Sequence, residues 1–221
     1  MPRTRIKICG VMRPQDAAAA VRAGADAIGM VFYPKAKRCI SIDRAREIMK
    51  EVPPFVTAIG LFVDQPAEEI RQTAAAVSLS YLQFHGKETP EFVADLREFR
   101  IIKALHADRQ TLFNQLELWR NSIESLHLRN LQGLILDTPA TSAPGGTGVE
   151  NDWELLAGLG DAGAPIIVAG GLTPLNVRRV VKLLNPYAVD VSSGVEENFG
   201  EKSAAKIEAF VSEVAAAFAS C

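Results

Sequence analysis

Two side chains suited to proton transfer stand at the ends of predicted strands. Cys9 ends the β-rich segment Arg5–Cys9, where a thiolate could abstract a proton from a substrate. Asp137 follows the apolar segment Gly133–Leu136, where partial burial would suit it to act as a general acid. Position alone leaves a plainer interpretation open for each: Cys9 as a small buried hydrophobe and Asp137 as a carboxylate that caps a loop.

Two glycine-rich turns near the carboxyl end could bind a phosphate group. One follows the apolar segment Pro165–Ala169, and the other follows Tyr187–Val191. Glycine lets backbone N–H groups approach an anion closely, and serine hydroxyls add further donors. The alternative is that these are ordinary turn glycines. The residues predicted to hold phosphate are Gly170, Gly171, Ser192, Ser193 and Gly194.

Arg38 lies in the basic segment Lys35–Arg38 and could hold a substrate carboxylate through its planar, forked guanidinium, although a solvated basic loop is the commoner case. Asp64, His85 and His106 end three consecutive predicted strands, which makes a metal site conceivable. No HxH or HExxH pair is present, so we expect no metal. We expect His85 to contact the substrate.

Strand and helix patterns alternate along the whole chain, which predicts a parallel sheet. Near-continuous apolar strands indicate a sheet covered on both faces, and eight repeats favour a closed (β/α)8 TIM barrel over an open doubly wound sheet. The predicted strands are Arg5–Cys9, Asp26–Phe32, Phe55–Val63, Ser80–Phe84, Arg100–Leu105, Gly133–Leu136, Pro165–Ala169 and Tyr187–Val191. The predicted helices are Pro14–Ala23, Asp43–Lys50, Ala67–Val77, Pro90–Arg97, Thr111–Leu126, Asp152–Leu159, Pro174–Leu183 and Glu201–Phe218. The active sites of such barrels form at the carboxyl ends of the strands, where the candidate residues lie.

Composition limits the classes of partner. The 221 residues are 48% hydrophobic and fit one α/β domain spanning residues 1–221. Lys and Arg number 24 against 26 Asp and Glu, with no run of five like charges, so we expect neither nucleic acid nor a membrane as partner. No stretch approaches the roughly 18 apolar residues of a membrane span. We expect a cytoplasmic protein, a monomer or homodimer, with free thiols at Cys9, Cys39 and Cys221.

Seven short motifs in a fixed order resemble the phosphoribosylanthranilate isomerase family, and the resemblance runs from Ile6 to about Phe210. The segments Lys7–Gly10 and Asp190–Glu196 are the most specific of them. The others are Gly24–Gly29, Gln83–Gly86, Leu136–Thr138, Gly145–Gly148 and Ala169–Leu172.

The resemblance implies an aldose–ketose isomerase of tryptophan biosynthesis that acts on a phosphosugar without metal or organic cofactor. Its reaction is the Amadori rearrangement of N-(5-phosphoribosyl)anthranilate to 1-(2-carboxyphenylamino)-1-deoxyribulose 5-phosphate. By the same resemblance, the general base falls on Cys9, the general acid on Asp137 and the anthranilate-binding arginine on Arg38. Each assignment agrees with the position of the residue after a predicted strand.

Two residues depart from the family pattern. Ala36 stands where the family often has serine, and Asn151 stands where it often has phenylalanine, which questions local loop contacts but not the reaction. The rival interpretations are another phosphosugar enzyme on the same barrel, such as indole-glycerol-phosphate synthase or the histidine-pathway isomerase, and a catalytically silent barrel in a multienzyme assembly. The sequence leaves open whether a second, related isomerisation is also catalysed. It assigns no role to Cys39 or Cys221.

Overall fold

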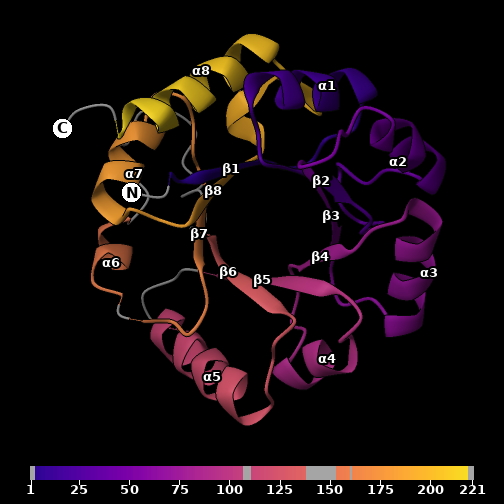
Figure 1. Cartoon of the computed structure of the whole chain (residues 1–221), viewed down its shortest axis with the longest axis vertical. Coiled ribbons are helices and arrows are strands. Elements are labelled where there is room, and N and C mark those ends of the chain that lie inside the picture. The colour runs from indigo at the N-terminus through magenta and orange to yellow at the C-terminus, as the bar shows by residue number, and fades with distance from the viewer. Residues whose placement is uncertain (1–2, 107–110, 138–152, 160, 219–221) are drawn as a thin grey trace.

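The computed structural model describes residues 3–106, 111–137, 153–159 and 161–218. Eight parallel strands form a closed barrel in sequence order, and β8 pairs with β1 to complete it. The helices form a ring around the strands (Figure 1). The prediction of a (β/α)8 barrel is therefore confirmed.

The strands occupy almost the segments that the apolar pattern predicts. They are β1 (Arg5–Ile8), β2 (Ala27–Val31), β3 (Thr57–Phe62), β4 (Tyr81–Phe84), β5 (Arg100–His106), β6 (Leu131–Asp137), β7 (Ile166–Ala169) and β8 (Ala188–Val191). The helices are α1 (Pro14–Ala23), α2 (Ile42–Met49), α3 (Ala67–Val77), α4 (Pro90–Asp95), α5 (Leu112–Ser125), α6 (Glu154–Ala157), α7 (Val177–Leu184) and α8 (Ala204–Ala216).

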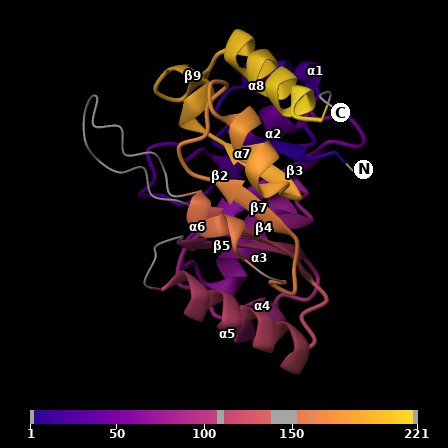
Figure 2. The same ribbon diagram turned by 90° about the vertical axis from the view of Figure 1, so that its left-hand side faces the viewer.

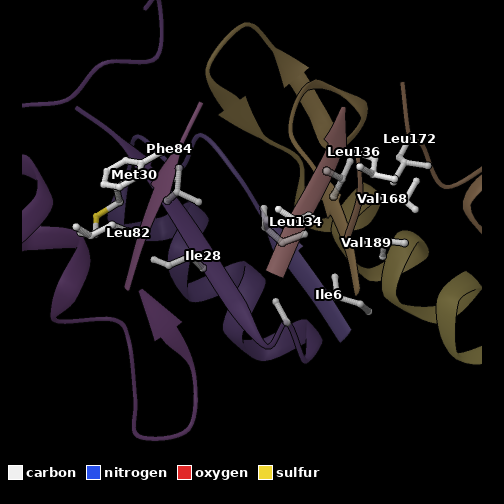
Figure 3. Close-up of a cluster of buried hydrophobic side chains, with 14 of the residues drawn as sticks. Ile6, Ile28, Met30, Leu82, Phe84, Leu134, Leu136, Val168, Leu172 and Val189 are labelled. Atoms are coloured by element: carbon white, nitrogen blue, oxygen red, sulfur yellow. The ribbon is translucent and has the colours of Figure 1, made fainter. Parts of the chain in front are cut away.

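Alternate residues of the strands face the helices and form the main core, because successive side chains of a strand point to opposite faces. Leu82 and Phe84 of β4 and Leu134 and Leu136 of β6 show this spacing and are fully buried. Figure 3 shows them with Ile6, Ile28, Met30, Val168, Leu172 and Val189 in the same cluster. The opposite positions point into the barrel. That smaller cluster includes Ala27, Ile59, Ala104, Ile135 and Ala169.

Local signals fix where several helices begin and end. Helix α1 starts with Pro14 and stops at Gly24, whose φ of 94° suits glycine. Helices α2 and α4 are capped by hydroxyls, since Ser41 accepts from the Arg44 amide and Thr89 from the Phe92 amide.

The last predicted helix was too long at its start. Glu201 and Lys202 form a short strand, β10 (Glu201–Lys202), antiparallel to β9 (Glu196–Asn198), and α8 begins only at Ala204. This β9–β10 hairpin lies between the end of β8 and α8 and is visible beside α8 in Figure 2. The hairpin escaped prediction because two- and three-residue strands carry no periodicity of their own.

Helix α7 also begins later than predicted, at Val177 rather than Pro174. The intervening residues form a turn in which the Thr173 amide donates to the Asn176 side chain. The motif Gly145–Gly148 lies outside the described residues, as do Asn151 and Cys221. Within the described part, no helix is long and apolar enough to cross a membrane.

The main core between the strands and the helices should contribute most of the free energy of unfolding. Leu82 is fully buried, so Leu82→Ala should lower the free energy of unfolding by about 2–5 kcal/mol through lost burial and a residual cavity. Leu175 is 98% exposed, so Leu175→Ala should change it by less than about 0.5 kcal/mol. Urea unfolding followed by circular dichroism measures both. Equal losses in the two variants would contradict the assignment of Leu82 to the core.

Candidate active site

A cavity of about 410 Å³ opens at the carboxyl ends of the strands. Every residue predicted for the site lines it, although these residues come from loops and strands far apart in sequence. They are Cys9, Arg38, His85, Asp137, Gly170, Gly171, Ser192, Ser193 and Gly194. The closed barrel therefore brings the predicted acid, base and anion-binding residues together around one space.

Cys9 directly follows β1 and is buried. Lys7 stands two residues earlier and so points to the same, inward face. A Cβ atom on the neighbouring Gly29 would lie 2.9 Å from Cys9 Sγ and 3.2 Å from Lys7 Cε, so both side chains pack against that glycine. Lys7 Nζ donates to Asp190 Oδ2 of β8 at 2.7 Å, and both members of this ion pair are buried. A positive charge thus lies directly beneath the thiol.

The environment of Cys9 acts on its pKa in opposite directions. Burial raises the pKa of the thiol above its ordinary value, the positive charge of Lys7 opposes that rise, and Asp190 adds to it. For Lys7, burial disfavours the ammonium ion, but Asp190 and Cys9 outweigh burial and raise the lysine pKa. Lys7 is therefore charged, and Cys9 is protonated at rest.

Asp137 lies at the end of β6 with its side chain 29% exposed. Its Oδ2 is 3.2 Å from His85 Nε2, and His85 Nδ1 is 3.1 Å from the amide nitrogen of Gln83. A donor from Gln83 at Nδ1 favours the tautomer whose proton is on Nε2, where it faces Asp137. His85 therefore holds one oxygen of the predicted acid and leaves the other for a ligand.

A buried ion pair anchors the turn that carries His85. Lys103 Nζ donates to the carbonyl oxygens of Phe84 and Gly86, on either side of His85, and to Glu88 at 3.0 Å. Glu88 accepts in turn from the amide of Gly86 at 2.9 Å. Burial lowers the pKa of Lys103, and the negative charge of Glu88 opposes this. These bonds fix the backbone that places the imidazole ring.

The two predicted phosphate loops touch each other. Gly170 and Gly171 have φ values of 86° and 62°, in the left-handed region that favours glycine. A Cβ atom on Gly194 would run into the carbonyl oxygen of Leu172, so only glycine fits where the second loop crosses the first. Lys202 Nζ donates to the carbonyl oxygen of Ser192 at 3.0 Å and approaches its hydroxyl at 3.4 Å. The loops thus form one surface with a buried cation behind it.

Arg38 is paired with Glu196. Its Nε and Nη2 donate to the two carboxylate oxygens of Glu196 at 2.8 and 2.7 Å, so this side of the guanidinium is occupied. The guanidinium also lies 4.6 Å from the centre of the Phe199 ring. Burial alone would raise the pKa of Glu196, but hydrogen bonds from Arg38 and Lys202 hold it at about 2. The other side of the guanidinium, formed by Nη1 and the second N–H of Nη2, remains for a substrate carboxylate.

The three candidate metal ligands do not converge on one point. The rings of His85 and His106 are 6.1 Å apart, and Asp64 accepts a hydrogen bond from the Lys87 amide. Among the described residues, no group of three His, Cys, Asp or Glu side chains could hold a metal ion.

Sequence reasoning missed five polar residues of the site: Lys7, Gln83, Asp190, Glu196 and Lys202. Two of them had a usable signal, since Lys7 stands two residues before Cys9 and Gln83 two residues before His85, so that each shares a face with its neighbour. Asp190 and Glu196 have partners far away along the chain, as with Arg38 and Glu196, which are 158 residues apart. Lys202 binds within the unpredicted hairpin and to the loop before it.

Comparisons with known proteins agree with this geometry. The family model of N-(5'-phosphoribosyl)anthranilate (PRA) isomerase matches residues 6–213. The N-(5'-phosphoribosyl)anthranilate isomerase of Pseudomonas aeruginosa (strain UCBPP-PA14) is 46% identical over 215 residues, covering 97% of this chain and 96% of that protein.

Solved structures of the same kind match the fold. Phosphoribosyl anthranilate isomerase from Thermotoga maritima is 37% identical, with a TM-score of 0.84 over 96% of this chain and 99% of that one. A phosphoribosyl anthranilate isomerase in complex with reduced 1-(o-carboxyphenylamino)-1-deoxyribulose 5-phosphate is 36% identical, with a TM-score of 0.82 and the same coverage. The chain belongs to the N-(5'-phosphoribosyl)anthranilate isomerase family, the aldose–ketose isomerases that carry out the Amadori rearrangement of tryptophan biosynthesis.

Proposed function

We propose that Asp137 is the general acid and Cys9 the general base of this isomerisation. The observation that carries the proposal is their position: both line one cavity, together with the two glycine loops and Arg38. The substrate, N-(5-phosphoribosyl)anthranilate, carries a phosphate, a ribose and a carboxylate. The lining thus offers donors for both anionic groups of the substrate beside the acid and the base.

The pose follows from the two anions. The 5′-phosphate binds at the loops that follow β7 and β8, with Ser192 and the glycines around it. The ribose then lies between the ends of β1 and β6, and the anthranilate carboxylate takes the Nη1 side of Arg38. A relative that holds the reduced product supports a phosphosugar of this kind as the ligand.

Asp137 acts first. It gives its proton to the furanose ring oxygen, the bond between that oxygen and C1′ breaks, and the anthranilate nitrogen forms a Schiff base with C1′. His85 holds Oδ2 of Asp137, which leaves Oδ1 for the substrate. We assign His85 this positioning role in addition to its place in the cavity wall.

Cys9 acts second. Its thiolate removes the proton from C2′, the electron pair forms a C1′=C2′ double bond, and the nitrogen regains its lone pair. The resulting enol becomes the ketone when the O2′ proton leaves and C1′ receives a proton. The Lys7 ammonium ion beneath Cys9 stabilises the thiolate that this step needs. Asp190 Oδ1 is buried in the cavity wall without a hydrogen-bond partner and suits a ribose hydroxyl.

Several expectations from the sequence stay predictions: the single domain, the cytoplasmic location, the monomer or homodimer, and the absence of a cofactor. None of the proton transfers above requires a metal or an organic cofactor.

Removing either proton-transfer group should stop turnover. Cys9→Ala and Asp137→Asn should each lower kcat by about 10²–10⁴-fold, the usual contribution of general acid–base catalysis. The assay follows the fluorescence of freshly made N-(5-phosphoribosyl)anthranilate, which falls as it is converted. Cys39→Ala is the control, because Cys39 does not line the cavity, and it should turn over normally. Near-normal turnover in either folded variant would overturn its assignment.

Removing the positive charge under Cys9 should change the pH dependence. Lys7 lowers the pKa of the thiol, so Lys7→Met should raise that pKa and move the limb of kcat/KM that Cys9 governs to higher pH. Absorbance of the thiolate near 240 nm, taken as a difference from the Cys9→Ser protein, reports the same ionisation. Lys182→Met is the control, because Lys182 is an exposed lysine of α7 that does not line the cavity. An unmoved limb in Lys7→Met would count against Cys9 as the base.

A further inference from the structure

The β9–β10 hairpin carries three side chains that contact Arg38 or Ser192 of the cavity lining: Glu196, Phe199 and Lys202. Glu196 and Phe199 hold Arg38, and Lys202 holds Ser192. The hairpin therefore touches both places where the proposed function puts an anionic group of the substrate.

Glu196 Oε1 connects these two places directly. It accepts from Arg38 Nε at 2.8 Å and from Lys202 Nζ at 3.0 Å. The Lys202 side chain has no exposed surface, and that of Glu196 is only 7% exposed. Burial lowers the pKa of Lys202, and the negative charge of Glu196 opposes this. A buried charge of this kind is tolerated only where its partners surround it, so the geometry of the cluster is fixed.

The bonds form a continuous chain from one anion site to the other. Ser192 is bound by Lys202, Lys202 by Glu196, and Glu196 by Arg38 through both carboxylate oxygens. Two cations flank one carboxylate, which leaves one net positive charge shared between the two sites. The phosphate loop thus has the Lys202 cation behind it, the other site has the Arg38 cation, and Glu196 ties the positions of the two together.

We propose that Lys202 and Glu196 are positioning residues that set the separation between the phosphate loop and Arg38. This inference rests on the proposed function, since it takes the phosphate at Ser192 and the anthranilate carboxylate at Arg38. A fixed separation favours a ligand that carries both anions on one frame, because neither site has to move to receive the second group. This bridge of Lys202 and Glu196 then favours ligands whose two anions have the right separation, rather than either anion alone.

The test compares one ligand that spans both sites with two that do not. The spanning ligand is reduced 1-(o-carboxyphenylamino)-1-deoxyribulose 5-phosphate, and the fragments are inorganic phosphate and anthranilate. In Lys202→Met each fragment should bind more weakly, because a positive charge is gone. Each loss is expressed as a fold-decrease in affinity. The fold-decrease for the reduced product should exceed the two fragment fold-decreases multiplied together, by roughly tenfold or more. Calorimetry gives the affinity of the reduced product, and competition against it gives those of the fragments.

Lys206→Met is the matched control. Lys206 lies close by on α8 and donates to the backbone oxygen of Glu196 at 2.7 Å, but it is no part of the bridge. For Lys206→Met, the fold-decrease in affinity for the reduced product should equal the two fragment fold-decreases multiplied together. Glu196→Gln is the second variant, because glutamine keeps the size of the side chain but cannot accept from both Arg38 nitrogens. It should show the same excess loss as Lys202→Met and carries the test if the lysine variant does not fold.

The outcomes separate the two proposals. If wild-type protein isomerises the substrate but neither Lys202→Met nor Glu196→Gln shows an excess loss, the positioning role is wrong and the proposed function stands. If the control shows the same excess as the bridge variants, the effect is general damage to the hairpin and the positioning role is again wrong. If wild-type protein neither isomerises the substrate nor binds the reduced product, the proposed function itself fails.

Discussion

The pairing of β8 with β1 closes the barrel, and the active site is built around that seam. The register sets Lys7 beside Asp190, so the last strand neutralises the charge that the first carries inward. Just beyond the seam, a Cβ atom on Gly10 would lie 2.6 Å from the Arg38 side chain and 3.0 Å from the Ser192 hydroxyl. Without closure, the base, the arginine and the phosphate loop would have no common neighbour.

The main effect of the buried ion pairs in this barrel is to hold side chains of the site in place. Such pairs contribute little net stability, because the cost of removing two charges from water offsets their attraction. Their value here lies in what they hold: Lys7 lies under the thiol, Lys103 fixes the turn that carries His85, and Glu196 orients Arg38. Each pair surrounds a group that must keep one orientation while a substrate enters.

The sequence predicted what is local and repetitive, and it missed what is long-range. Alternating apolar segments located the eight strands, and the rule that barrel sites lie at strand ends located Cys9 and Asp137. The same rule could not show that Arg38 pairs with Glu196, because no local pattern marks a pairing across 158 residues. The β9–β10 hairpin was hidden for a related reason, since its strands are too short for a period and its bonds reach back to the loop after β2.

The balance of charges around Cys9 shows where the catalytic power of this site must come from. Burial raises the pKa of the thiol and the positive charge of Lys7 offsets only part of that rise, so the protonated thiol is favoured over the thiolate. A strongly ionised base is therefore not what the fold provides. It provides a cavity in which the acid and the base follow different strands. A substrate bound at both ends presents its ring oxygen to Asp137 and its C2′ to Cys9. Holding reacting groups in place in this way removes much of the entropic barrier, which compensates for a base that is mostly protonated at rest.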